Sequence, residues 1–200
     1  ARRLGWEPRS GESEDDGLMR RTVLSALAAL ADDPWIRAQG LGRAKAFLAD
    51  FDAVEVDLET VALMVAARSG QLGFSELRAA LDRVKSSRQR TAIVQGLASF
   101  ADPTELGKTL ALLAAGGIRA QDSVYVARAA AEWPDSRATL IGWLEKNLAT
   151  IAKRYPGFGT ARMVSTVRRL CDDGAVRAAE GALSPILEEL GSSRRRLREA

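Results

Sequence analysis

The feature that most constrains the fold is a recurring pattern of helix start, apolar stripe and helix stop. The stretch LASFADPTELGKTLALLAAGGIRAQD, from Leu97 to Asp122, contains one complete example. Pro103 suits the first turn of a helix, where its missing N–H costs nothing. The apolar side chains then recur every three or four residues, at Leu106, Leu110 and Leu113. Gly116 and Gly117 follow the stripe and predict the end of the helix.

The same pattern recurs along the chain and predicts about eleven helices. Their expected starts lie at or near Asp15, Pro34, Leu58, Ser75, Arg88, Pro103, Asp122, Ser136, Thr160, Asp172 or Asp173, and Ser192 or Ser193. Helix pairs begin at intervals of about 30 to 40 residues, which is typical of solenoids. No stretch alternates with period two for long. We therefore expect an all-α fold, an α-solenoid of antiparallel helix pairs of the HEAT or armadillo kind.

The expected organisation is a single helical-repeat domain spanning residues 1–200. Residues 1–14 form a polar entry segment, residues 15–56 the first helices, and residues 57–200 the stacked helix pairs. A chain of 200 residues can bury a core without disulfides or metal ions. The opening ARRLGWEP does not look like a natural start, so we expect a fragment of a longer protein.

Composition excludes several classes of active site. The chain has 0 His and 1 Cys, so it cannot form an H-E-x-x-H zinc site, a Ser-His-Asp triad or a cysteine-cluster zinc site. The lone Cys171 is expected to be a small core residue, and this cysteine usage favours a cytoplasmic location. No apolar run is long enough to span a membrane.

Two kinds of polar feature admit a structural or a chemical interpretation. The carboxylate pairs Asp15-Asp16 and Asp172-Asp173 stand at expected helix starts, where negative charge is favoured. Capping is the preferred interpretation, and acid–base chemistry the alternative. Arg119 is placed to bond Asp122 across a turn, which is also structural.

Other features suggest ligands or nucleic acid. GFGTAR, residues 157–162, could cradle a phosphate at a helix start, but it lacks the lysine of a P-loop. Trp133 and Trp143 could stack on bases, although filling gaps between helices is the preferred interpretation. RRRLR at residues 194–198 could bind phosphate, or could form a solvated last helix. Acidic residues are interspersed almost everywhere in a chain of net charge +3, so we expect no nucleic-acid partner.

Arg162 is a candidate binding residue. It follows the turn RYPGFG and stands in the first turn of the helix expected from Thr160. A guanidinium in this position could hold a carboxylate through two parallel hydrogen bonds. An ordinary surface arginine is the alternative.

Three segments, taken in order, resemble one known family. They are LGWEPRSGESEDDGLMRR, ASFADPTELGKTLALLAAGGIRAQD and WLEKNLATIAKRYPGFGTARMVSTVRRLCDD. Together they resemble the C-terminal helical domain of zinc aminopeptidases of the aminopeptidase N and puromycin-sensitive type. The resemblance covers about residues 4–197.

The resemblance implies a multidomain metallopeptidase that removes N-terminal residues from peptides. Zinc, the H-E-x-x-H motif and the G-x-M-E-N segment of such enzymes lie in a catalytic domain, and none of these motifs occurs in this chain. The helical domain is implied to cover the catalytic cleft and to control substrate access and length. Its expected partners are the N-terminal and catalytic domains of the same polypeptide and the peptide substrate.

The resemblance also bears on two residues. In the related leukotriene-hydrolase branch, an arginine in a G-R-M segment contacts the C-terminal carboxylate of the peptide, and Arg162 in YPGFGTARM stands in a similar place, with Ala161 where that branch has glycine. Glu59 stands where relatives often show arginine.

The alternative to this whole account is a free-standing helical-repeat module that binds another protein.

Overall fold

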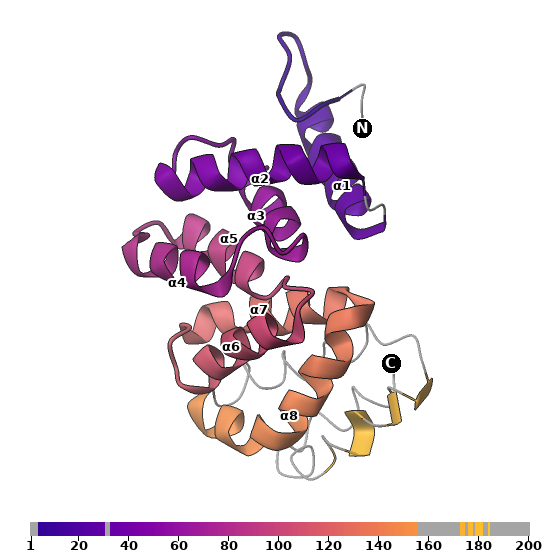
Figure 1. The fold of residues 1–200 in the computed structure, drawn as a ribbon, viewed down its shortest axis with the longest axis vertical. Coiled ribbons are helices and arrows are strands. Elements are labelled where there is room, and N and C mark those ends of the chain that lie inside the picture. The colour runs from indigo at the N-terminus through magenta and orange to yellow at the C-terminus, as the bar shows by residue number, and fades with distance from the viewer. Residues whose placement is uncertain are drawn as a thin grey trace. The chain divides into compact units, whose positions relative to one another are not determined.

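A computed structural model describes residues 4–30 and 33–155, together with a few positions between residues 173 and 184. The chain divides into two compact units, Ala1–Phe100 and Ala101–Ala200. Every regular element in the described ranges is a helix (Figure 1). The predicted all-α class is therefore confirmed.

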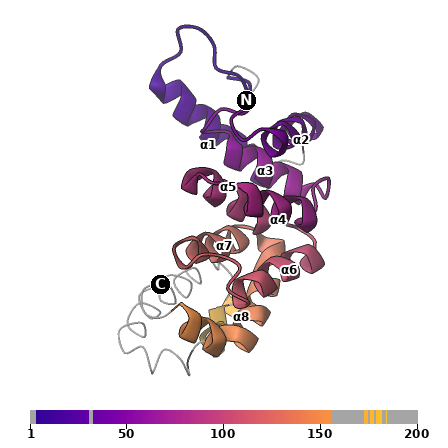
Figure 2. The ribbon, with the colours of Figure 1, turned by 90° about the vertical axis from the view of Figure 1, so that its left-hand side faces the viewer.

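The first unit contains five helices in its described part: α1 (Glu14–Leu30), α2 (Pro34–Ala49), α3 (Glu59–Arg68), α4 (Phe74–Arg83) and α5 (Ser87–Leu97). Helix α3 is central, because α2 and α5 both pack against it and α1 contacts it as well (Figure 2). Seven of the ten residues of α3 are buried. The core around α3 is formed by fully buried side chains, among them Leu24, Ile36, Phe47, Leu63, Leu77, Ile93 and Leu97.

The contact between α2 and α3 depends on a glycine. A Cβ atom at Gly40 would lie 2.5 Å from Cγ1 of Val65, much closer than real carbon atoms approach. The missing side chain therefore allows the two helix backbones to come together. This explains why a glycine that weakens helix propensity stands inside α2.

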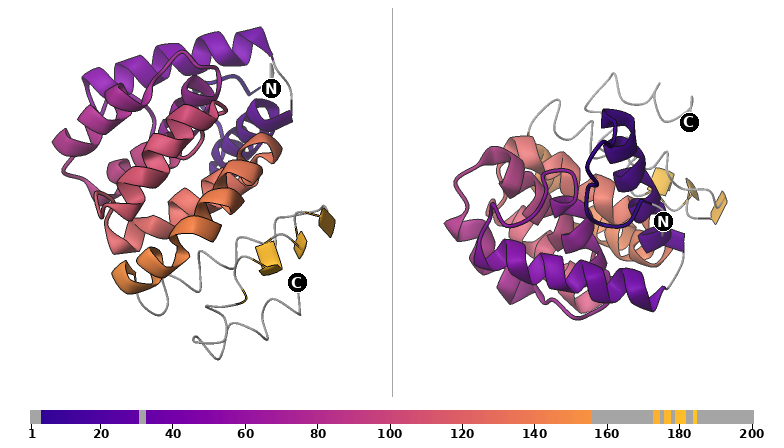
Figure 3. Two further views of the ribbon diagram at one scale, coloured as in Figure 1. Left: turned by 60° about the horizontal axis from the view of Figure 1, so that its bottom comes forward. Right: turned by 90° about the horizontal axis from the view of Figure 1, so that it is seen from above.

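The second unit contains α6 (Pro103–Ala114), α7 (Ala120–Glu132) and α8 (Pro134–Arg154) in its described part. The long α8 packs against both α6 and α7 (Figure 3). The buried side chains along these helices recur at helical spacing and include Leu106, Leu110, Leu113, Val126, Leu140, Leu144, Leu148 and Ile151. Trp133 is 2% exposed, so this ring fills the core, as its structural interpretation predicts.

Several predicted helix ends are confirmed. Asp33 is the N-cap of α2 and accepts hydrogen bonds from the N–H groups of Trp35 at 2.8 Å and Ile36 at 3.2 Å. Gly70 after α3 and Gly116 after α6 both have positive φ, 68° and 82°. Only glycine adopts this conformation without strain, which is why these two residues end their helices.

Three predicted helix starts are wrong by a few residues. Helix α4 is not capped by Ser75; its N-cap is Gly73, whose N–H donates to Oε2 of Glu76 at 2.9 Å. Helix α7 begins at Ala120, so Asp122 lies inside the first turn rather than at the cap. Helix α8 begins at Pro134 and not at Ser136, because proline suits the first helical position.

The stacking of these helices into a solenoid and the single-domain organisation stay predictions. The first eight of the eleven expected helices correspond to α1–α8. The three expected from Thr160, from Asp172 or Asp173, and from Ser192 or Ser193 fall wholly or mostly outside the described residues. No helix in the described ranges combines the length and hydrophobicity needed to cross a lipid bilayer.

Candidate functional site

Most of the ligand-binding candidates from the sequence fall outside the described residues. These are Arg162, the glycine-rich stretch 157–162, Cys171 and the basic stretch 194–198. The carboxylate Asp16 is described, and its role is structural. The N–H and Oγ of Ser13 donate to Oδ2 of Asp16 at 3.2 and 2.9 Å, and the N–H of Asp16 donates back to Oγ of Ser13 at 3.3 Å. This reciprocal cap starts α1.

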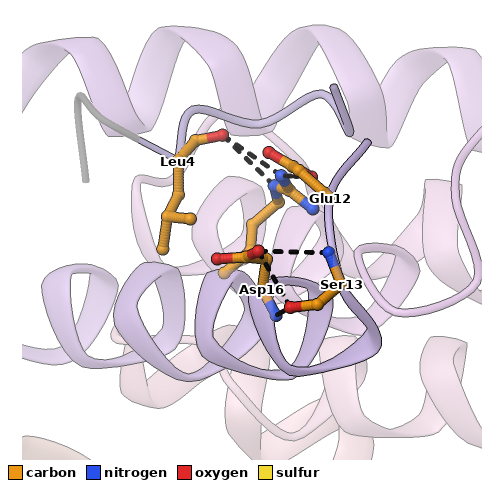
Figure 4. Close-up of polar contacts among 5 residues, drawn as sticks. Leu4, Glu12, Ser13 and Asp16 are labelled. Carbon is orange, nitrogen blue, oxygen red and sulfur yellow. Dashed lines mark hydrogen bonds and ion pairs between the residues drawn. The ribbon is translucent and has the colours of Figure 1, made fainter. Parts of the chain in front are cut away.

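The most elaborate polar structure in the described residues surrounds the N-terminal segment, which sequence reasoning treated only as an entry loop. Arg20 of α1 is 4% exposed. Its Nε and Nη2 atoms both donate to the carbonyl oxygen of Leu4 at 3.3 Å, and Nη2 also pairs with the carboxylate of Glu12 (Figure 4). A buried guanidinium is tolerated only when its donors are satisfied, and these partners satisfy it from within the N-terminal segment.

A second arginine fastens the same segment to α2. The Cζ atom of Arg43 lies 5.0 Å from the centroid of the Trp6 ring, a cation–π arrangement. Arg43 also pairs with Glu7, and its Nη1 donates to Oε1 of Gln39 at 2.8 Å. Trp6 is 2% exposed. The two arginines thus hold residues 4–12 against the helices from two sides.

These contacts shape a hollow in the first unit, which we call the acidic hollow. It consists of two adjoining pockets, with volumes of about 360 and 510 Å³, that share Glu55 and Leu58 in their walls. The N-terminal segment, the first turns of α1 and the segment before α3 form the walls. The lining residues are Glu7, Pro8, Arg9, Glu12, Ser13, Glu14, Gly17, Leu18, Arg20, Arg43, Asp52, Ala53, Val54, Glu55, Val56, Asp57 and Leu58.

The charge of the acidic hollow is opposite to that of the whole chain. Its lining includes six acidic residues and three arginines, a formal difference of −3, whereas the chain carries +3. The arginines Arg20 and Arg43 are already paired with Glu12 and Glu7. Hydrogen bonding from Arg20, followed by the Arg9 backbone, lowers the pKa of Glu12. The Glu12 carboxyl therefore stays ionised in its pair with Arg20.

A buried carboxylate lies at the start of α3, behind this surface. Glu59 is 1% exposed, and one of its oxygens pairs with Arg88 of α5. Its Oε1 atom is buried and has no hydrogen-bond partner among the described residues. Burial raises the pKa of Glu59, although the bond with Arg88 opposes this effect. The pairing of Glu59 with Arg88 joins two different helices and is visible only in the structure.

In the second unit, polar contacts hold the turn between α6 and α7. The Oη atom of Tyr155 lies 2.9 Å from the carbonyl oxygens of both Leu113 and Ile118. Nε of Arg119 donates to Oδ2 of the buried Asp122 at 2.7 Å, which confirms the predicted bond across this turn. These contacts are structural.

The described residues do not fit a metal centre, because no group of three or more His, Cys, Asp and Glu side chains among them could hold an ion. Fold and site together define an all-helical domain whose main polar feature, in the part of the chain described, is a preformed hollow. The family model for the ERAP1-like C-terminal domain matches residues 1–200. The chain therefore belongs to this family, as the resemblance of its sequence segments implied.

Individual relatives agree with this assignment. The chain is 30% identical over 174 residues to "Aminopeptidase M1" of Arabidopsis thaliana, which covers 84% of this chain and 20% of the relative. It is 28% identical over 172 residues to "Aminopeptidase M1-A" of rice, with 83% and 19% covered. A "Probable aminopeptidase 2" of Sulfurisphaera tokodaii is 29% identical over 166 residues, with 82% and 21% covered. The chain thus spans about one fifth of these relatives.

Proposed function

We propose that this chain is the C-terminal helical domain of a zinc aminopeptidase that removes N-terminal residues from peptides. The observation that carries the proposal is the family match over residues 1–200. It is supported by relatives that are named aminopeptidases and are about five times longer than the matched segment. In this proposal the metal and the catalytic groups belong to the remaining part of the parent polypeptide.

The domain itself acts by shape. We propose that it covers the catalytic cleft of the parent and controls which peptides enter and how long they are. Capped helix ends support this role, because they fix where a helix begins without any reacting group. We also propose that the parent is cytoplasmic. The partners of this domain are then the N-terminal and catalytic domains of the same polypeptide and the peptide substrate.

The purified 200-residue chain should release no amino acid from an aminoacyl-anilide substrate, with or without added zinc. The parent polypeptide that contains this chain should release it, and a chelator should abolish that activity, because the metal supplies the nucleophilic water. Colour release by the anilide substrate measures both preparations. Zinc-dependent turnover by the isolated chain, or a parent without aminopeptidase activity, would contradict the proposal.

A further inference from the structure

The acidic hollow contains more carboxylates than the three arginines of its lining can neutralise. Asp57 pairs with Arg21 at 3.7 Å, and Asp52 accepts a hydrogen bond from Gln89 at 2.9 Å. Glu14 and Glu55 are exposed, and neither forms an ion pair with another described residue. Arg9 is the only arginine in the lining that is not already paired inside the hollow. The hollow therefore presents a net negative surface toward solvent.

Exposed apolar side chains accompany this charge. Leu18 lines the larger of the two adjoining pockets and Val56 the smaller one, and these side chains are 53% and 56% exposed. Met19, which follows Leu18 in the chain but does not line the hollow, is 50% exposed. These three are among only four large apolar side chains of the described residues that are so exposed, the fourth being Trp35. Leu18 and Val56 thus add exposed apolar groups to a charged hollow, a combination that suits an interaction surface.

The hollow is also held in shape before any partner arrives. Arg20 ties the N-terminal wall to α1 through buried contacts, and Arg43 of α2 packs on the buried Trp6 ring and pairs with the exposed Glu7. The N–H groups of Leu58 and Glu59 donate to the carbonyl oxygen of Glu55 at 2.9 and 3.2 Å, which holds the opposite wall at the start of α3. A preorganised surface loses little conformational entropy when it binds.

We propose that the acidic hollow docks a basic and partly apolar protein surface supplied by the other domains of the parent polypeptide. The inference rests on the proposed function, because it requires the longer parent. Two observations select this occupant. The relatives contain about four fifths of their length outside the matched segment, and the excess carboxylates of the hollow demand lysine or arginine side chains on the partner. Apolar side chains between those cations would cover Leu18 and Val56.

Hydrogen–deuterium exchange of the intact parent tests the proposal. Amides in the first turns of α1 and in residues 52–58 should exchange more slowly in the parent than in the 200-residue chain, because docking buries these segments. Glu55→Lys should replace the proposed attraction between Glu55 and the basic partner surface with repulsion. The amides of these segments should then exchange about tenfold faster or more in the parent. Leu18→Ser tests the apolar contribution and should act in the same direction.

Glu145→Lys is the matched control, since Glu145 is an exposed residue of α8 that does not line the hollow. It should leave exchange at the hollow unchanged. In the isolated 200-residue chain, Glu55→Lys and the unmodified protein should exchange alike, which shows that the substitution does not disturb the local fold. Increased exchange in the isolated variant would show a structural role for Glu55 and would overturn the proposal.

Other outcomes also decide the matter. Equal exchange at the hollow in the parent and the isolated chain would overturn the docking proposal, even if the parent is an active aminopeptidase. Concentration-dependent dimerisation of the isolated chain that Glu55→Lys abolishes would assign the hollow to a second copy instead. If the unmodified parent has no aminopeptidase activity, the proposed function is contradicted. Slower amide exchange at the hollow in the parent than in the isolated chain would still support docking.

Discussion

Arg20 and Glu59 are both buried charged side chains, yet their surroundings differ. The guanidinium of Arg20 has partners in Leu4 and Glu12, so its burial is compensated by hydrogen bonds. Glu59 has one partner, Arg88, and its second oxygen has none among the described residues. The nearby Asp52 adds repulsion between like charges. Ionisation of Glu59 therefore opposes folding.

Replacing Glu59 with glutamine should increase stability at neutral pH. Because the pKa of Glu59 is raised in the folded chain, its stabilising contribution is present below its ordinary value of 4.5 and is lost as pH rises through the folded pKa. Glutamine does not ionise, so Glu59→Gln avoids the stability that is lost when the buried carboxyl becomes charged. We expect a gain on the order of 1 kcal/mol in the free energy of unfolding at pH 7. Urea unfolding at several pH values measures it.

The difference between Glu59→Gln and the unmodified chain should shrink as pH falls below 4.5, where the buried carboxyl is protonated in both the folded and the unfolded chain. Glu145→Gln, a neutralisation on the exposed face of α8, serves as the control and should change little. A variant that is less stable at pH 7 would show that the pair with Arg88 outweighs the cost of burial.

Arg162 carries the prediction on substrate binding. Arg162→Ala in the intact parent should raise KM for peptides more than for anilide substrates, which lack a C-terminal carboxylate, because the guanidinium is proposed to bind that group. Steady-state kinetics with matched peptide and anilide substrates provides the comparison. Arg128→Ala is the control, since Arg128 is an exposed arginine of α7. Equal effects on both substrates would refute recognition of the carboxylate.

At the scale of the element, the end of α8 is fastened to the turn between α6 and α7. Tyr155 follows the last residue of α8 and is 4% exposed, and its hydroxyl bonds the carbonyl oxygens on both sides of Gly116 and Gly117. Those two glycines end α6 within very little space, because a Cβ at Gly116 would lie 2.3 Å from Nη1 of Arg154. The turn and the helix end thus stabilise each other.

Tyr155→Phe should lower the stability of the second unit by about 1 kcal/mol, since the carbonyl oxygens of Leu113 and Ile118 lose the hydroxyl proton that they share. Burial raises the pKa of Tyr155 above its ordinary value of 10.0. The hydroxyl therefore contributes fully below pH 10, and its contribution is lost as pH rises through the folded pKa. The stability difference between the two proteins should accordingly narrow in strong alkali.

Tyr125→Phe is the matched control for this experiment, because Tyr125 is a half-buried tyrosine of α7 whose hydroxyl has no hydrogen-bond partner among the described residues. It should leave the free energy of unfolding nearly unchanged. Urea unfolding of the three proteins at pH 7 and above pH 10 gives the comparison. Equal stability of Tyr155→Phe and the unmodified chain would show that the two bonds contribute nothing net.

At the scale of the whole molecule, much of the helical content could be predicted and the candidate site could not. The Asp33-Pro34 start and the stops at Gly70 and Gly116 are confirmed, since each depends on residues within one turn of the chain. The start of α7 was misplaced because Asp122 bonds Arg119 from inside the first turn instead of capping it. An aspartate near a helix start can be the N-cap or a first-turn residue, and the sequence pattern is the same in both cases.

The sequence by itself determined the all-helical class, most helix ends and the family to which the chain belongs. These depend on short-range hydrogen bonding, on backbone freedom at glycine and proline, and on the order of recognisable segments. Only the tertiary structure decided that Arg20 and Arg43 enclose the N-terminal segment, that Glu59 meets Arg88, and that carboxylates from three segments surround one hollow. Those arrangements join residues far apart in the chain, and packing between helices selects them.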